Sequence, residues 1–245
     1  AYAAGYDDSG WRELELPHDW AVEGDFSIDN PSGTGGGALP GGIGWYRKTF
    51  VAPENEADRV WRLEFDGVYM NSEVFVNGES LGVRPYGYIS FGYDISPYLR
   101  WGEENVIAVR VDNAEQPNSR WYSGCGIYRN VWMLKTSELC IPSDGLFCYL
   151  ASMDMNRIDR TPLARLNLDV KVKNCSDEQK WYRYGLVIKD AEGRTVCSSP
   201  YTLSQPVSVN PGEEKEHNWS DLQVPDPVLW DVDTPYLYTV IYSLY

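Results

Sequence analysis

Residues 120–129 combine the side-chain types with which proteins bind sugars. Their order is Arg-Trp-Tyr-Ser-Gly-Cys-Gly-Ile-Tyr-Arg. A sugar ring has hydroxyls around its rim and an apolar C–H face, so an arginine can donate several hydrogen bonds to the rim while Trp and Tyr stack on the face. We therefore predict a sugar-facing loop. The alternative is a strand-edge loop that buries Trp121 and Ile127 and leaves Arg120 and Arg129 at the surface.

Hydrolysis of a glycosidic bond with retention of configuration requires two carboxylates about 5 to 5.5 Å apart on a rigid scaffold. The sequence has one Asn-Glu pair, Asn55-Glu56, and it lies in an acidic Pro-Glu-Asn-Glu-Ala-Asp turn between expected strands. A solvated loop explains this turn better than a catalytic acid does. We therefore exclude Glu56 as a catalytic residue.

Histidine-based catalysis has two candidates, His18 and His217, and neither lies in a recognisable nucleophile or metal motif. In Leu-Pro-His-Asp-Trp at residues 16–20, Asp19 could fix the tautomer of His18. We interpret His18 and Asp19 as residues that hold a loop by hydrogen bonds. Glycines crowd residues 33–44 with no helix pattern behind them, whereas a phosphate cradle needs a helix N-terminus. We expect a long, mobile loop there.

The net charge of −15 disfavours phosphate backbones and anionic membrane surfaces as partners. We therefore expect no nucleic-acid and no membrane partner, and no apolar run approaches the roughly 20 residues of a transmembrane helix. The cysteines are odd in number and scattered without CxxC pairs, so we expect buried thiols, no metal site and no cofactor. They are Cys125, Cys140, Cys148, Cys175 and Cys197.

The elements that must position these residues are strands. Apolar residues alternate with polar ones at residues 60–65, 106–111 and 166–173, which is the period of a strand with one buried face. Residues 73–82 have Asn77-Gly78 at their centre, the strongest short-range signal of a hairpin. Residues 181–189, 195–198 and 239–245 add short strands, with a turn at 191–193. The chain is therefore expected to be all-β.

The strand pattern of residues 130–135 gives way to Cys-Ile-Pro-Ser-Asp-Gly near residue 140, which is typical of a crossing between domains. We predict two domains, residues 1–140 and residues 141–245. The rhythm of the second half suggests an immunoglobulin-like sandwich, although Cys175 and Cys197 do not reproduce the Cys-Trp-Cys spacing of antibody domains.

Several segments in order resemble glycoside hydrolase family 2. They are residues 16–20 (Leu-Pro-His-Asp-Trp), 44–50 (Gly-Trp-Tyr-Arg-Lys-Thr-Phe), 65–68 (Phe-Asp-Gly-Val), 76–78 (Val-Asn-Gly), 94–99 (Asp-Ile-Ser-Pro-Tyr-Leu), 105–113 (Asn-Val-Ile-Ala-Val-Arg-Val-Asp-Asn), 120–124 (Arg-Trp-Tyr-Ser-Gly) and 229–238 (Leu-Trp-Asp-Val-Asp-Thr-Pro-Tyr-Leu-Tyr). The resemblance covers nearly the whole chain. It implies a sugar-binding jelly-roll, similar to galactose-binding domains, followed by an immunoglobulin-like β-sandwich.

The form of the segment at Arg120 is most similar to that of β-galactosidases. That resemblance implies hydrolysis of terminal β-galactosides with retention, by two glutamates on a C-terminal (β/α)8 barrel, which is then the partner of this portion. No catalytic residue is expected within residues 1–245, and the 245 residues alone are expected to be inactive. The start of the chain also looks cut, because residues 7–12 resemble a segment that the family precedes with a further strand.

In the family, loop residues of the jelly-roll reach the rim of the galactose pocket. By this resemblance Asn113 and Arg120 are candidate donors to sugar hydroxyls, and Trp121 or Tyr122 a candidate apolar wall. The alternative is that they brace a domain interface. The chain departs from some members in having Gly41-Gly42 where an asparagine contacts galactose, and Ser119 where an aspartate holds sodium. No metal site is inferred.

Three other identities stay open from the sequence. The chain could be the same portion of a β-glucuronidase or β-mannosidase, an autonomous carbohydrate-binding module, or a structural scaffold of sandwich domains. The natural linkage and aglycone are undetermined, and a homo-oligomer is compatible with the sequence. A periplasmic or exported location is favoured over the cytoplasm, because family members of polysaccharide-degrading bacteria are often exported.

Overall fold

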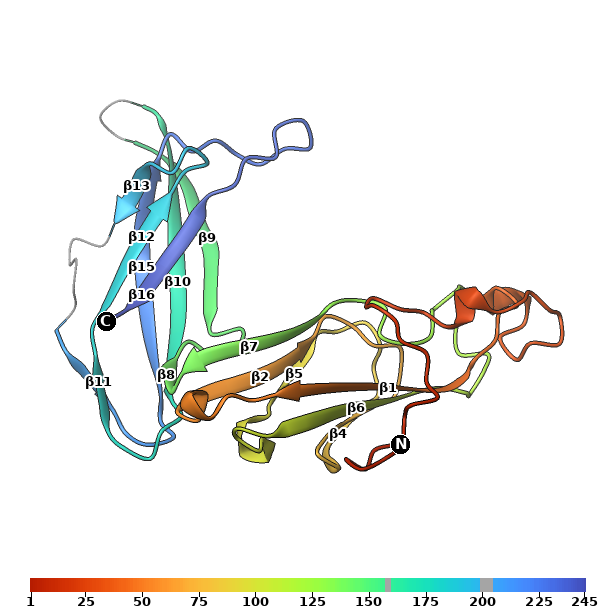
Figure 1. The fold of residues 1–245 in the computed structure, drawn as a ribbon. Coiled ribbons are helices and arrows are strands. Elements are labelled where there is room, and N and C mark those ends of the chain that lie inside the picture. The colour runs from red at the N-terminus through yellow and green to blue at the C-terminus, as the bar shows by residue number, and fades with distance from the viewer. Residues whose placement is uncertain (157–159, 199–204) are drawn as a thin grey trace. The chain divides into compact units, whose positions relative to one another are not determined.

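The computed structural model describes residues 1–156, 160–198 and 205–245. It confirms that the chain is all-β, with short 3₁₀ turns at Ala21–Glu23, Thr34–Gly36, Glu54–Glu56 and Ser96–Tyr98. The chain divides into two compact units, Ala1–Thr136 and Ser137–Tyr245, here called unit 1 and unit 2 (Figure 1). The sequence-based division lies after residue 140, at the end of the short strand β8 (Leu139–Cys140).

Unit 1 contains two sheets that enclose one core. One sheet has the order β1-β6-β3-β4, formed by β1 (Gly42–Val51), β6 (Glu104–Asn113), β3 (Ser72–Val76) and β4 (Glu79–Arg84). The other has the order β5-β2-β7, formed by β5 (Phe91–Asp94), β2 (Arg59–Phe65) and β7 (Val131–Ser137). Apolar side chains of β2, β3 and β6 meet in a single cluster that includes Leu63, Phe65, Val76 and Val109. The predicted alternation therefore places one face of each sheet in the core.

The hairpin of β3 and β4 turns at Asn77-Gly78, as the sequence predicts. Both residues have positive φ, 51° for Asn77 and 93° for Gly78. A two-residue turn with both φ values positive matches the twist of antiparallel strands, and Asn-Gly adopts it at low cost. The Asn77 side chain also donates to Asn105 Oδ1 and to the carbonyl of Tyr98, at 2.8 Å each, which ties the turn to β6 and to the turn at Ser96–Tyr98.

Unit 2 is built around the long strand β10 (Pro162–Asn174). It pairs with β15 (Glu214–Pro225), with β9 (Leu146–Met155) and with β8. A second sheet has the order β13-β12-β16, formed by β13 (Thr195–Ser198), β12 (Tyr184–Lys189) and β16 (Thr239–Leu244). Buried residues of β10, β12 and β15, among them Leu168, Ile188 and Val224, form one core.

One strand that the sequence predicts in unit 2 is divided into two in the structure. Residues 181–189 form two strands, β11 (Lys180–Tyr182) and β12, with a break at Arg183. The physical reason is a change of partner, because β11 pairs with β14 (Val207–Val209) whereas β12 pairs with β16. At the break, the backbone of Arg183 exchanges two hydrogen bonds with Tyr245, of 2.9 and 2.8 Å.

Candidate sugar-facing site

The loop between β6 and β7 is held at its base by Asn113, the last residue of β6. Asn113 is 2% exposed, and its Nδ2 donates to the Gly124 carbonyl and to Cys125 Sγ, at 3.0 Å each. Its Oδ1 accepts hydrogen bonds from Gln116 and Asn118, of 2.8 and 2.6 Å. Both ends of the amide are therefore engaged within the loop. This placement does not favour the predicted role of Asn113 as a donor to sugar hydroxyls, because the side chain is buried and already bonded.

The aromatic residues of the loop lie at the surface. Trp121 is 60% exposed and Tyr122 40% exposed, and Arg120 is exposed next to them. Trp121 Nε1 donates to the hydroxyl of Tyr88 at 3.1 Å, and the Tyr122 hydroxyl donates to Asp19 Oδ2 at 2.5 Å. The strand-edge alternative is correct for Ile127, which is 2% exposed, and wrong for Trp121. The loop thus presents one cation and two rings to solvent, with the polar end of each ring already held.

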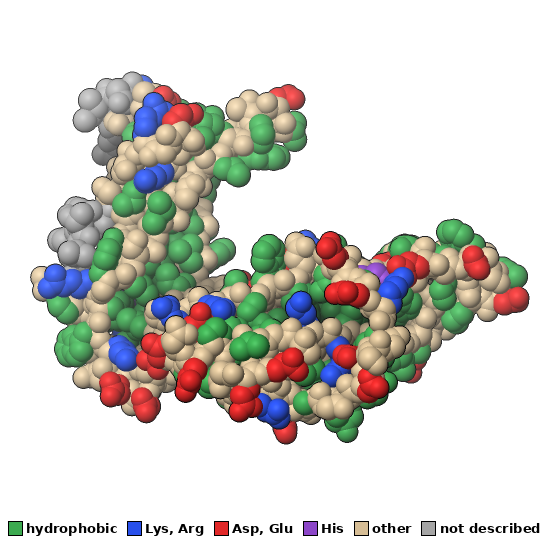
Figure 2. Space-filling model, in the orientation of Figure 1, with side chains coloured by type: hydrophobic (Ala, Val, Ile, Leu, Met, Phe, Trp, Pro, Cys, Tyr) green, Lys and Arg blue, Asp and Glu red, His purple; other side chains and the backbone are tan. Residues whose placement is uncertain are grey.

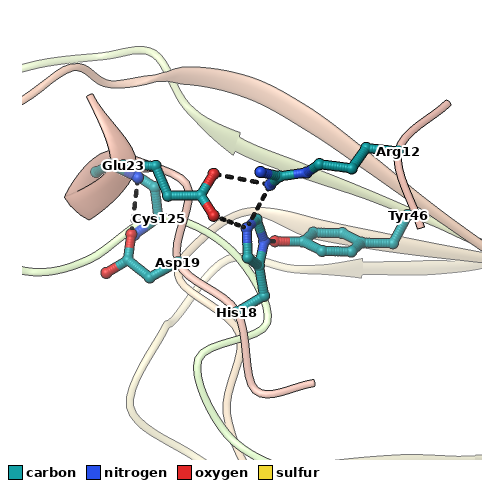
Figure 3. A network of polar contacts seen from close by, with 7 residues as sticks. Arg12, His18, Asp19, Glu23, Tyr46 and Cys125 are labelled. Carbon is teal, nitrogen blue, oxygen red and sulfur yellow. Dashed lines mark hydrogen bonds and ion pairs between the residues drawn. The ribbon is translucent and has the colours of Figure 1, made fainter. Parts of the chain in front are cut away.

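Asp19 ties this loop to the N-terminal segment. Its Oδ1 accepts hydrogen bonds from the backbone N–H groups of Ala21, at 3.0 Å, and Cys125, at 2.9 Å, while Oδ2 accepts from Tyr122. Gly124 has φ of 81°, and a Cβ there would lie 2.9 Å from Asp19 Oδ2. Only glycine therefore suits this position. Asp19 does not contact the imidazole of His18, because its carboxylate points away from that ring and towards Cys125 (Figure 3).

His18 belongs to a separate polar network, shown in Figure 3. Its Nδ1 lies 2.8 Å from the Tyr46 hydroxyl, and its Nε2 lies 3.0 Å from Arg12 Nη2 and 3.2 Å from Glu23 Oε1. Arg12 and Glu23 also form an ion pair of 2.7 Å, which lowers the pKa of Glu23 and raises that of Arg12. Burial raises the pKa of Tyr46 to about 12, so Tyr46 stays protonated. Both imidazole nitrogens are engaged, and the backbone N–H of His18 donates to the Ile127 carbonyl at 2.8 Å.

A small pocket lies behind the aromatic residues of the loop. Its lining includes Leu39, Pro40, Trp121, Tyr122 and Cys125. The cavity volume is about 10 Å³, room for about one water molecule and far too little for a sugar ring. Burial raises the pKa of the Cys125 thiol to about 11, so the thiol is protonated and is no nucleophile at neutral pH. A sugar could therefore reach the exposed face of the loop, but this pocket could not enclose it.

The glycine-rich segment forms the other side of the pocket. Its backbone is internally bonded, since Ala38 N–H donates to the Gly33 carbonyl at 2.7 Å and Ser27 N–H donates to the Ala38 carbonyl at 2.9 Å. Ser32 Oγ donates to the Leu39 carbonyl at 2.6 Å. A loop is present up to Gly41, and these bonds give it a defined path, whereas the last glycines of the expected loop, Gly42 and Gly44, lie in β1.

Sequence reasoning missed two aromatic residues of the neighbouring loop, Tyr86 and Tyr88. Tyr88 bonds Trp121, and its ring centroid lies 5.2 Å from that of Tyr69 and 5.7 Å from that of Tyr86. Gly87 lies between them, where a Cβ would be 2.2 Å from the Tyr69 ring. The sequence signal was the triplet Tyr-Gly-Tyr, because a glycine between two aromatic residues permits close approach to a third.

Within the described ranges, no group of three His, Cys, Asp or Glu side chains is arranged to hold a metal ion. Cys125 and Cys140 are buried, as expected, whereas Cys148, Cys175 and Cys197 are partly exposed. On the described part of the face seen in Figure 2, acidic side chains are spread over unit 1 with basic ones among them, and no continuous basic stripe crosses it. Among the described residues, no helix is long and apolar enough to cross a bilayer.

Two models of one protein family match the chain. Residues 36–137 match the sugar binding domain of glycosyl hydrolases family 2, and residues 152–245 match a further domain of the same family. Among solved structures, a family 2 member from Bacteroides cellulosilyticus superposes with a TM-score of 0.88 at 33% identity. That superposition covers 100% of this chain and 31% of the other.

Curated relatives carry two different activities in their names. A β-galactosidase of Bacteroides ovatus, BoGH2A, is 55% identical over 97% of this chain. A putative β-glucuronidase of Formosa agariphila is 38% identical over 95% of it. The chain spans 27% of the length of the first relative and 20% of the second. With both family models matching in order and the solved structure superposing throughout, the chain belongs to glycoside hydrolase family 2.

Proposed function

We propose that the chain is the non-catalytic N-terminal portion of a retaining β-galactosidase. The observation that carries this proposal is the 55% identity to the β-galactosidase of Bacteroides ovatus over 97% of the chain. In this proposal, unit 1 lends the loop at residues 119–124 to the wall of a galactose pocket. The two carboxylates that cleave the bond lie about 5 to 5.5 Å apart on a barrel domain outside these residues.

The geometry of the loop supports a role in sugar binding for unit 1, with the catalytic carboxylates on another domain. Trp121 and Tyr122 present exposed rings that are held by hydrogen bonds to Tyr88 and Asp19. Rings that are already ordered lose little conformational freedom when a sugar stacks on them. Arg120 is exposed beside them and can donate to hydroxyls. The cavity of about 10 Å³ cannot enclose a sugar, so in this proposal the floor of the pocket comes from the barrel.

A second candidate is the same portion of a β-glucuronidase, which the putative β-glucuronidase of Formosa agariphila favours at 38% identity. Glucuronides carry a carboxylate at C6, where galactosides carry a hydroxymethyl group. An exposed guanidinium such as Arg120 can pair bidentately with a carboxylate, whereas it makes neutral hydrogen bonds to a hydroxyl. The two substrates also differ in the orientation of the C4 hydroxyl, so specificity between them depends on the charge at C6 and on the contacts to that hydroxyl.

The test compares 4-nitrophenyl β-galactoside, β-glucuronide and β-mannoside as substrates of the full-length gene product. We expect the highest kcat/KM on the galactoside, with retention of configuration at the anomeric carbon by NMR. An Arg120→Gln variant should raise KM for the preferred substrate, because a shorter side chain with two donors replaces the five donors of the guanidinium. A preference for the glucuronide would replace the galactosidase proposal by the second candidate.

A further inference from the structure

Three exposed aromatic residues lie together on two loops of unit 1. Tyr86, Tyr88 and Trp121, here called the aromatic platform, are 57%, 44% and 60% exposed. The first two lie between β4 and β5, and Trp121 lies between β6 and β7. Clustered aromatic rings of this size at a surface mark a recognition site, because scattered single exposures are normal and contiguous ones are not.

The rings of the aromatic platform are held in place from behind. Trp121 Nε1 donates to the Tyr88 hydroxyl, and the Tyr88 ring packs on Tyr69, which is 5% exposed. Tyr69 is in turn fixed by two backbone hydrogen bonds to Gly126, of 2.9 and 3.0 Å. The indole N–H of Trp121 is satisfied by the Tyr88 hydroxyl, while 60% of Trp121 remains exposed. The aromatic platform is therefore preorganised for a ligand that stacks.

Polar groups surround these rings. The Tyr69 hydroxyl donates to Asn118 Oδ1 at 3.3 Å, and Ser119 Oγ lies 2.8 Å from Ser123 Oγ. A surface that alternates aromatic faces with hydroxyl and amide groups matches a sugar chain, whose units alternate C–H faces with hydroxyls. The chain's net charge of −15 disfavours an anionic ligand.

We propose that the aromatic platform binds the sugar units that follow the terminal galactose of a neutral oligosaccharide of three or more units. This inference rests on the proposed function. Its argument is continuity, because Trp121 belongs to the aromatic platform and also lines the small pocket beside Tyr122. A chain whose terminal unit occupies the galactose pocket therefore passes over Tyr88 and Tyr86. All three aromatic residues lie within residues 36–137, which match the sugar binding domain of the family.

The experiment measures galactose release by the full-length gene product from methyl β-galactoside and from a β-linked galactotetraose. Tyr86→Ala should lower kcat/KM on the tetrasaccharide about threefold to tenfold, the range expected when one aromatic stacking contact is lost, and leave methyl β-galactoside within about twofold. Tyr88→Ala also removes the hydroxyl that accepts from Trp121 Nε1, so it should lower kcat/KM on both substrates, and more on the tetrasaccharide. Tyr98→Ala, a 38% exposed tyrosine on the turn at Ser96–Tyr98, is the matched control and should change neither substrate.

Tyr88→Phe distinguishes stacking of a sugar on the Tyr88 ring from support of Trp121 by the Tyr88 hydroxyl. It keeps the ring and removes the hydroxyl that accepts from Trp121, so it should give a smaller loss on the tetrasaccharide than Tyr88→Ala. Equal effects of Tyr86→Ala on both substrates, or no effect on either, would overturn the inference. If the wild-type protein releases a different terminal sugar, the proposed function fails. The same variants, measured on a methyl glycoside and a tetrasaccharide of that sugar, still test whether the aromatic platform binds the following sugar units.

Discussion

Asp19 shows how one carboxylate can organise a binding loop. It accepts hydrogen bonds from two backbone N–H groups and from the Tyr122 hydroxyl. One of these N–H groups belongs to Cys125, which lies 2.9 Å away in the structure and 106 positions away in the sequence. Hydrogen bonds to an ionised carboxylate are stronger than neutral ones. Burial and the bond to Asp19 raise the pKa of Tyr122, so its hydroxyl remains a donor throughout the physiological range.

Asp19→Asn is expected to weaken this connection. The amide keeps one acceptor oxygen, loses the charge, and sets an NH2 group against a donor. We expect the free energy of unfolding of unit 1 to fall by about 1 to 3 kcal/mol, the usual range for a hydrogen bond to a charged group. Urea unfolding followed by tryptophan fluorescence measures the change. The control is Asp25→Asn, an exposed aspartate in the same segment, which should leave stability unaltered. Equal stability of the two variants would rule out the organising role.

Residue types predicted the loop better than they predicted its contacts. The sequence placed a sugar-facing loop at residues 120–129, and the exposed rings of Trp121 and Tyr122 lie there. It offered His18 as a possible partner of Asp19, because local partners are the ones that a sequence reveals. Two of the three actual partners of Asp19, Tyr122 and Cys125, follow β6, which pairs with β1. The burial of Asn113 likewise follows from closure of the loop, which the local pattern does not contain.

At the scale of elements, alternation predicted strands β2, β6 and β10, and Asn-Gly predicted the hairpin. The break between β11 and β12 had no such signal, because Trp181 to Lys189 contains no proline and its only glycine is Gly185, inside β12. The break arises where the chain leaves one partner strand for another. Such an exchange is a property of the assembled sheets, and local pattern does not contain it.

Rings from four strands of unit 2 meet near this break. The His217 ring on β15 lies 4.3 Å from the Tyr184 ring on β12, and Tyr184 stacks on Tyr242 of β16 at 5.6 Å. His217 Nε2 lies 2.6 Å from the hydroxyl of Tyr182 on β11, whose pKa burial raises to about 12. Burial, and secondarily the charge of Lys215, lower the pKa of His217. The folded unit therefore favours the neutral imidazole.

Acid should destabilise unit 2 through His217. An unfolded histidine titrates near 6.5, and the folded pKa is lower, so between the two values the unfolded state binds more protons. The free energy of unfolding should then rise with pH up to about 7 and decrease as pH falls through about 6.5. Urea unfolding from pH 7.5 to 5 measures this slope, and His217→Gln should reduce it. The same slope in both proteins would assign the pH dependence to other groups.

At the scale of the whole molecule, the proposed function gives this chain the role of shaping a site, with the chemistry performed outside these residues. The family models match both units in order, and the chain spans 27% of the length of the Bacteroides ovatus relative. Unit 1 contributes ordered rings, a cation and a cavity of about 10 Å³. A sugar that stacks on one exposed face keeps most of its surface in water. Its affinity is then far below that of a sugar enclosed on several sides.

The 245-residue chain should therefore bind galactose weakly and hydrolyse no galactoside. Isothermal titration calorimetry should show no saturable binding at or below about 1 mM, which corresponds to about −4.1 kcal/mol, and 4-nitrophenyl β-galactoside should not be turned over. Trp121→Ala is the control, and its heats should match those of the unmodified chain. Saturable binding at or below 1 mM that Trp121→Ala abolishes would instead identify an autonomous carbohydrate-binding module. In that case the loop at Trp121 would bind the sugar without a contribution from a second domain. Turnover by the 245 residues would contradict the proposal that the catalytic carboxylates lie outside them.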